Sequence, residues 1–272
     1  MKATDDPLSL RTGFRAGAMP RPTAGLATGY AQANIAIVPA AFVGEFAAFL
    51  EANPAACPLI ARGTAGDPAM PELGADIDIR FDLPRYRVFR EGRIEGEPTD
   101  ISDVWRDDLV AFAIGCSLTF EADLLAGGVD LRCYTPGTTC SAFDTDLPLR
   151  RVGRFGGRLV VSMRAIRADQ VSRAAEITRR HPESHGGPIH IGDPSEIGVD
   201  LNCPIDGIGL TDIRPGEVAV FWACGVSMER AIQSAAPDLA ITHAPGHMLI
   251  TDQRASPACA DMPATRPREP AQ

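Results

Sequence analysis

Arg158-Leu-Val-Val-Ser-Met-Arg-Ala-Ile166 sets the fold class of this chain of 272 residues. Its β-branched and other apolar residues are typical of a buried strand. A helix is predicted directly after it, from about Ala168 to Arg180. A strand followed at once by a helix of this length indicates an α/β protein, rather than a helical bundle or a β-sandwich.

The same alternation is predicted on both sides of this unit. Further strands are expected at residues 34–38, 84–90, 129–134, 217–223, 239–242 and 248–251. Helices are expected at residues 40–53, 105–114 with Ser102 as the N-cap, 117–126 before the Gly127-Gly128 stop, and 227–235. The Ala, Pro and Arg residues after Asp252 predict a disordered tail.

Composition narrows the class of function. The net charge is -9, with no basic stripe, so nucleic acid is not an expected partner. No apolar run reaches the roughly 18 residues of a membrane span, and the N-terminus lacks a signal-peptide core, so we expect a cytoplasmic protein that binds no membrane. The seven cysteines show no CxxC pair and no zinc-ribbon spacing, and an odd count without an export signal predicts reduced thiols.

Four of the five histidines lie in two loops rich in Gly and Pro. One loop is His185-Gly-Gly-Pro-Ile-His190-Ile-Gly-Asp193, and the other is Thr242-His-Ala-Pro-Gly-His-Met-Leu-Ile-Thr-Asp252. Pro and Gly break a helix, so His243 and His247 are expected on either side of a bend. This concentration of imidazoles predicts a functional site.

Ten segments, in order, resemble the D-glutamate cyclase family, a family of hydro-lyases. They are residues 29–34 (Gly-Tyr-Ala-Gln-Ala-Asn), 53–58, 76–80, 83–88, 105–112, 115–121 (Gly-Cys-Ser-Leu-Thr-Phe-Glu), 160–164 (Val-Val-Ser-Met-Arg), 185–194, 220–226 (Val-Phe-Trp-Ala-Cys-Gly-Val) and 242–252. The resemblance covers roughly residues 22 to 252. Two segments depart from it: Asp144-Thr-Asp146, where Arg-Thr-Asn is expected, and Pro204-Ile-Asp-Gly-Ile-Gly209, where Pro-Asp-Phe-Gly-Asp is expected after Asp200.

The resemblance implies an α/β fold: a three-layer αβα sandwich with a smaller two-layer α+β subdomain inserted mid-chain. The expected divisions are an N-terminal arm over residues 1–21, a main domain over 22–130 and 205–252, the subdomain over 131–204, and the tail over 253–272. It also implies a lyase that converts D-glutamate to 5-oxo-D-proline with loss of water. Exchanging a cation for an acid at Asp144 can remove a partner for a substrate carboxylate, so another small carboxylate is an alternative substrate.

Lactam closure needs a base for the ammonium proton, an acid for the departing oxygen and donors for the oxyanion. The histidine candidates for proton transfer are His185, His190, His243 and His247. Asp193 and Asp252 can orient an imidazole, and Arg164 can grip a carboxylate. Cys116 is a candidate nucleophile, and the backbone amides of Cys116 and Ser117, at an expected helix start, are a candidate anion site. Gln32, Asn34 and Ser162 are further candidates for substrate binding.

Each candidate also has a structural interpretation. The histidines can stabilise their loops by hydrogen bonds, Cys116 can be a packed thiol, and Arg164 can be an ion-pair partner. Glu121 is interpreted as a surface acid or a helix cap. No cofactor is predicted; a divalent metal held by the four histidines and an aspartate is the alternative.

Three functional hypotheses remain from the sequence: a cyclase, a dehydratase or tailoring cyclase of the same fold acting on another small carboxylate, and a non-catalytic ligand-binding protein. The expected partner is a small carboxylate or amino acid, and a homo-oligomer is possible.

Overall fold

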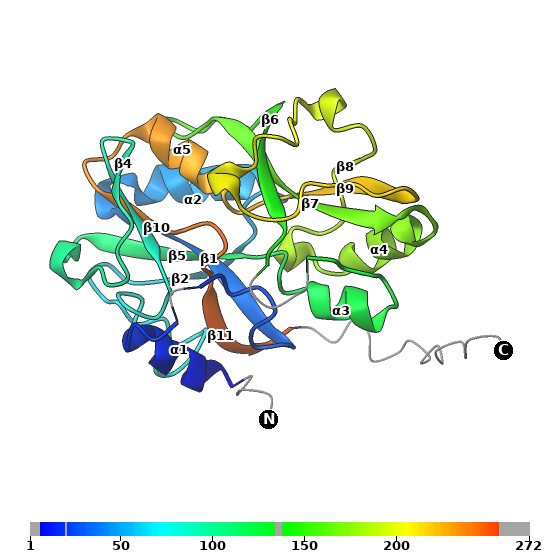
Figure 1. The fold of residues 1–272 in the computed structure, drawn as a ribbon. Coiled ribbons are helices and arrows are strands. Elements are labelled where there is room, and N and C mark those ends of the chain that lie inside the picture. Colours follow the sequence, from blue (N-terminus) through cyan, green and yellow to red (C-terminus); the bar gives the residue numbers. More distant parts are fainter. Residues whose placement is uncertain (1–5, 20, 134–137, 256–272) are drawn as a thin grey trace.

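The computed structural model describes residues 6–19, 21–133 and 138–255, and its strands form two antiparallel sheets (Figure 1). The larger sheet has seven strands in the order β2-β5-β1-β10-β3-β4, with β11 also paired to β1. Its strands are β1 (Tyr30–Pro39), β2 (Leu59–Arg62), β3 (Tyr86–Arg90), β4 (Arg93–Gly96), β5 (Leu109–Gly115), β10 (Ala240–His243) and β11 (Leu249–Arg254).

The smaller sheet has four strands in the order β6-β7-β9-β8. They are β6 (Ser141–Pro148), β7 (Arg158–Arg167), β8 (His190–Ile191) and β9 (Glu217–Ala223). The predicted strand at residues 158–166 is confirmed as β7, the central strand that pairs with both β6 and β9. Strand β9, expected in the main domain, is hydrogen-bonded into this sheet; the domain divisions themselves stay a prediction.

Helices cover one face of each sheet. Helices α2 (Val43–Ala52) and α5 (Ser227–Ala235) pack on the larger sheet, with Phe46 and Met228 in one core cluster beside Ala36 and Phe112. Helices α3 (Glu121–Ala126) and α4 (Val171–Thr178) pack against β7 and β9. Helix α1 (Pro7–Arg15) packs on β11.

The opposite face of the larger sheet is covered by irregular chain. Met70, Leu73, Ile77 and Leu83 supply this cover, and all four lie between β2 and β3. The mixed α/β class is confirmed, while the expected three-layer αβα arrangement is not.

Residues 105–114 were expected to be helical, and this prediction is wrong. Leu109–Gly115 is strand β5, every residue of which is buried between β1 and β2. A central strand that is buried on both faces has an unbroken run of apolar residues in the sequence. The periodicity of apolar residues does not distinguish such a run from a buried helix. Residues 129–133 form no strand, and Tyr134 lies outside the described residues. Strands β2, β4, β6 and β8 were not predicted.

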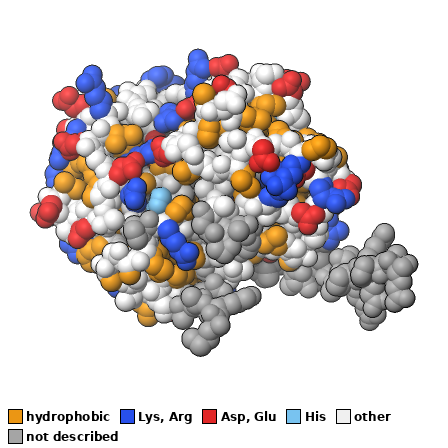
Figure 2. All heavy atoms as spheres, in the orientation of Figure 1, with side chains coloured by type: hydrophobic (Ala, Val, Ile, Leu, Met, Phe, Trp, Pro, Cys, Tyr) orange, Lys and Arg blue, Asp and Glu red, His pale blue; other side chains and the backbone are white. Residues whose placement is uncertain are grey.

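The visible face of the molecule carries interspersed positive and negative side chains (Figure 2). None of the helices in residues 6–19, 21–133 and 138–255 is long and apolar enough to cross a membrane. Strand β11 runs to Arg254, two residues into the segment expected to be a tail, and residues 256–272 lie outside the described part.

Candidate functional site

A cavity lies where the two sheets meet, with an empty volume of about 450 Å³ that includes open solvent at its mouth, and we call it the junction cavity. Five of the residues singled out from the sequence line it: Asn34, Cys116, Ser117, Ser162 and His185. They come from β1, the β5–α3 turn, β7 and the segment before β8. The structure therefore brings together side chains that are up to about 150 positions apart in the sequence.

The Asn34 side chain is held by the end of the neighbouring strand. Its Nδ2 donates to the carbonyl oxygens of Gly115, at 2.5 Å, and Ile114, at 3.4 Å. Gly225, in the turn between β9 and α5, lies against this amide, and a Cβ there would come within 2.4 Å of it. Only glycine lets the backbone of this turn approach Asn34 so closely.

His185 is buried and neutral. Its Nδ1 lies 2.9 Å from the carbonyl oxygen of Ala55, which can only accept, so Nδ1 carries the proton and the lone pair is on Nε2. Burial, together with the nearby Arg164 cation, lowers the pKa of His185 to about 4, although hydrogen bonds to the backbone of Ala55 and Gly115 act in the opposite direction. At neutral pH this imidazole is therefore in the form that can accept a proton.

Arg164 does not reach the cavity as a free cation. Its Nη2 and Nε lie 2.6 and 2.9 Å from Oε1 of Glu121, and each side chain is 1% exposed. The guanidinium also donates to two cavity hydroxyls, Ser117 Oγ at 3.0 Å and Ser162 Oγ at 3.3 Å. The interpretation of Glu121 as a surface acid is wrong. The apolar residues Phe120, directly before α3, and Leu124, within it, were the available signal that this turn is buried.

Three thiols line the junction cavity, those of Cys116, Cys140 and Cys224. Burial raises the pKa of each, to about 12 for Cys224 and further for Cys116. They are neutral near pH 7, which favours the packed-thiol interpretation of Cys116 over the nucleophile. Helix α3 begins at Glu121, so the amides of Cys116 and Ser117 do not lie at a helix start, as was expected.

His243 points away from the junction cavity. Thr242 faces α5, because its hydroxyl donates to Glu229 at 3.1 Å, and successive side chains of a strand face opposite ways. Asn34 lies on the α5 face, beside Gly225. His243 does not line the junction cavity with His185, and burial lowers its pKa to about 3; its role in proton transfer stays a prediction.

His243 has a structural contact instead. Strand β1 pairs with β11 through Ala33 and with β10 from Ala36 onward, so that edge of β1 is interrupted between them. At the interruption the Ile35 amide donates to Nδ1 of His243 at 3.2 Å. The imidazole thus satisfies a buried backbone group that the sheet leaves unpaired.

The other candidates lie elsewhere. His247 donates to the Pro245 carbonyl at 2.9 Å, and burial lowers its pKa. His190, in β8, bonds the Asp193 carbonyl at 2.8 Å, and the Asp193 side chain caps the next turn through Ser195. Asp252 is 2.9 Å from Arg11 in an ion pair on the α1 side.

Gln32 lines two other cavities, and its Nε2 donates to the carbonyl oxygens of Thr23 and Leu26. Within the described residues no three His, Cys, Asp or Glu side chains are grouped so as to hold a metal ion.

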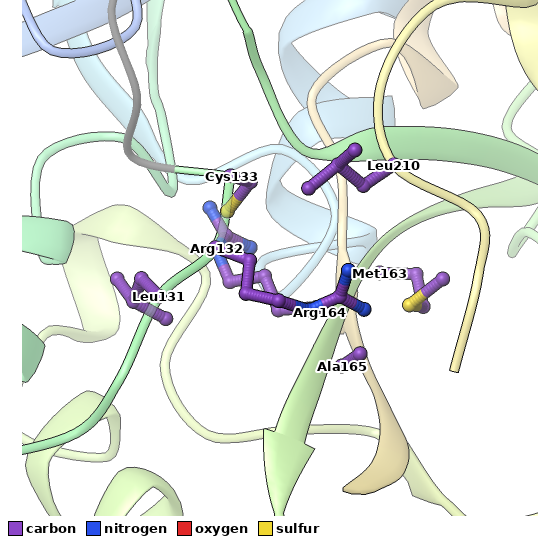
Figure 3. A pocket seen from close by; sticks show the side chains of 7 residues that line it. All are labelled: Leu131, Arg132, Cys133, Met163, Arg164, Ala165 and Leu210. Atoms are coloured by element: carbon purple, nitrogen blue, oxygen red, sulfur yellow. The ribbon is translucent and has the colours of Figure 1, made fainter. Parts of the chain in front are cut away.

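A smaller cavity, with an empty volume of about 250 Å³ that includes open solvent, adjoins Arg164 (Figure 3). Its seven labelled residues include Cys133, Met163 and Arg132. Arg132 is paired with Asp212 and Glu217, at 3.0 and 2.9 Å. The polar groups predicted from the sequence other than Arg164 are absent from this lining, so the junction cavity is the candidate site.

The comparisons with known proteins identify the family. The model of the D-glutamate cyclase family matches residues 110–252. The chain belongs to this family. A Bordetella petrii protein named "Putative hydro-lyase" is 51% identical over 88% of this chain and 90% of its own length. A protein of the same name from Rhizobium johnstonii is 48% identical over 93% and 94%. A solved nitrogen repressor-like protein from Methanococcus jannaschii aligns over 86% of this chain and 90% of its own, at 13% identity and a TM-score of 0.37.

Most of the junction cavity lies inside the segment matched to the D-glutamate cyclase family, with Asn34 as the exception among the five predicted residues. The two departures from the family pattern can also be placed. Asp144 forms an ion pair with Arg230 at 2.6 Å, and Asp146 with Arg158. Ile208, from the second departure, lines the cavity. The altered loop, rather than the altered strand, therefore contacts the candidate site.

Proposed function

We propose that this chain is a lyase of the hydro-lyase type that cyclises an acidic amino acid with loss of water, as in the conversion of D-glutamate to 5-oxo-D-proline. Family membership supports the reaction class. The observation that supports the site is the buried neutral imidazole of His185, which lines one cavity together with Asn34, Ser117 and Ser162.

In this reaction the α-ammonium loses a proton, and the neutral amine attacks the side-chain carboxyl carbon. A C–N bond forms, a C–O bond breaks, and the oxygen leaves as water. We assign the first proton to Nε2 of His185, the nitrogen that does not bond Ala55. A bound substrate carboxylate raises the pKa of this imidazole, because a nearby negative charge favours the imidazolium that burial and Arg164 disfavour. The same imidazolium returns this proton to the departing oxygen. After the C–N bond has formed, the nitrogen loses a second proton, which the imidazole carries to the same oxygen, so that the oxygen leaves with both protons as water.

The test is conversion of D-glutamate or L-glutamate to 5-oxoproline, followed by mass spectrometry. We expect product from the D-enantiomer, and a loss of about 100-fold or more in kcat for His185→Gln, since a general base contributes about 10²–10⁴-fold. His190→Gln is the matched control, because His190 contacts the Asp193 carbonyl and does not line the cavity. Equal losses in the two variants would contradict the assignment of His185.

A second candidate function, cyclisation or dehydration of another small carboxylate, is favoured by the position of Ile208. This residue lines the cavity from the loop that departs from the family pattern. If neither glutamate enantiomer is converted, a screen of small carboxylates distinguishes this function from the non-catalytic alternative.

A further inference from the structure

Arg164 is bonded on one side to an acid and on the other to two hydroxyls of the junction cavity. Glu121 Oε1 accepts from Nε and Nη2, while Ser117 Oγ accepts from Nη2 and Ser162 Oγ from Nη1. All four side chains are buried, with at most 4% of any residue exposed. The ion pair therefore fixes the positions of both serine oxygens.

A guanidinium has donors only, whereas a hydroxyl has one donor and two lone pairs. Because each serine oxygen accepts from Arg164, its own O–H cannot point back at the guanidinium. In the described part of the chain neither hydroxyl has an acceptor of its own, and both side chains line the cavity. Two O–H groups are thus available to a ligand, and each is polarised by the cation behind it.

The rest of the lining also favours an anion. No Asp or Glu of the described residues lines the junction cavity, and its three thiols are neutral. An acceptor-only group such as a carboxylate matches paired O–H donors, whereas an ammonium group would meet no anionic partner there.

We propose that the hydroxyls of Ser117 and Ser162 bind a carboxylate of the ligand, with Arg164 and Glu121 as positioning residues behind them. This inference rests on the proposed function, in which the site takes a small amino acid with two carboxylates. It assigns the carboxylate that does not react to the serine pair, and it replaces the expected direct contact of that group with Arg164.

The experiment is calorimetric titration of the full chain with 5-oxo-D-proline and with its neutral carboxamide. Wild-type protein is expected to bind the carboxylate at least tenfold more tightly. In Ser117→Ala and Ser162→Ala the affinity for the carboxylate falls about tenfold to a hundredfold, as for loss of a hydrogen bond to a charged group. The affinity for the carboxamide changes far less.

Conservative and control variants separate positioning from structural damage. Ser117→Thr keeps the hydroxyl and retains the preference for the carboxylate. Arg164→Lys loses it, since a lysine is a point charge that cannot reach both serines. Ser195→Ala changes a serine outside the cavity, beside Asp193, and leaves both affinities unchanged.

Three results would overturn the inference: no binding of either compound by the wild type, equal affinity for the two, or equal loss of both affinities in the alanine variants. Turnover of D-glutamate is measured separately. Turnover without serine-dependent discrimination refutes this inference and leaves the proposed function standing. Serine-dependent discrimination between the two compounds without turnover of D-glutamate refutes the proposed function and leaves this inference standing.

Discussion

Replacing Glu121 by leucine tests whether the buried ion pair is as strongly coupled as its geometry indicates. Oε1 of Glu121 accepts two charge-assisted hydrogen bonds from Arg164, at 2.6 and 2.9 Å, and both side chains are 1% exposed. Removing the acid leaves a buried, uncompensated guanidinium. We expect Glu121→Leu to lower the free energy of unfolding by about 3–5 kcal/mol, and Arg164→Met to lower it by a similar amount.

The double variant provides the decisive comparison. With both charges gone, two apolar side chains fill the space beside Phe120 and Trp222, whose rings lie 5.2 and 5.4 Å from the guanidinium carbon. Replacing a buried pair by packed apolar groups is often neutral or stabilising. We therefore expect the double variant to lie within about 2 kcal/mol of wild type, although it loses the preference for a carboxylate ligand.

The assay is urea unfolding of the four proteins, followed by far-UV circular dichroism so that the changed surroundings of Trp222 do not affect the signal. The double-mutant cycle gives the coupling energy directly. A double variant that loses the sum of the two single losses would refute the reasoning, and so would a Glu121→Leu variant that loses less than about 1 kcal/mol.

Further predictions concern titration, nucleophilic catalysis and metals. His243 has a pKa of about 3 in the folded protein and an ordinary value of 6.5, so below pH 6.5 the unfolded state binds more protons and the free energy of unfolding decreases as the pH is lowered. Between pH 7 and pH 5 this decrease is about 2 kcal/mol, and His243→Gln should remove it, as measured by urea unfolding at both pH values. Cys116→Ser should lower kcat less than about tenfold in the 5-oxoproline assay, since burial keeps that thiol neutral; a 10³-fold loss would restore the nucleophile hypothesis. Dialysis against EDTA should leave turnover unchanged, because the described residues offer no cluster of three metal ligands.

Much of the fold could be predicted from local patterns. Residues 158–166, 217–223 and 227–235 were assigned correctly, because β-branched runs and a helical repeat of apolar residues are local signals. Leu109–Gly115 was not, since a strand buried on both faces carries no alternation. Strand β6, which begins at Ser141, was also missed. Its exposed residues, such as Asp144 and Asp146, alternate with buried ones.

The sequence predicted several residues of the candidate site but not the contacts between them. Polar residues within motifs identified Ser117, Ser162 and His185, which do converge. Their pairing with Glu121 could not be predicted, because α3 and β7 meet only in three dimensions, 43 positions apart in the sequence. The face on which His243 lies depends on the register between β10 and β3, and one residue of shift would exchange the two faces.

The segment from Thr242 to Asp252 still contributes to the candidate site, through its backbone. Pro245 and Gly246 line the junction cavity, and the turn that carries them leaves the sheet where the edge of β1 is interrupted. His243 accepts from the buried Ile35 amide that the sheet leaves unpaired there, and His247 bonds the Pro245 carbonyl. Two imidazoles that look catalytic in the sequence therefore shape a wall of the cavity. Of the four histidines singled out from the sequence, His185 alone lines the junction cavity with its side chain.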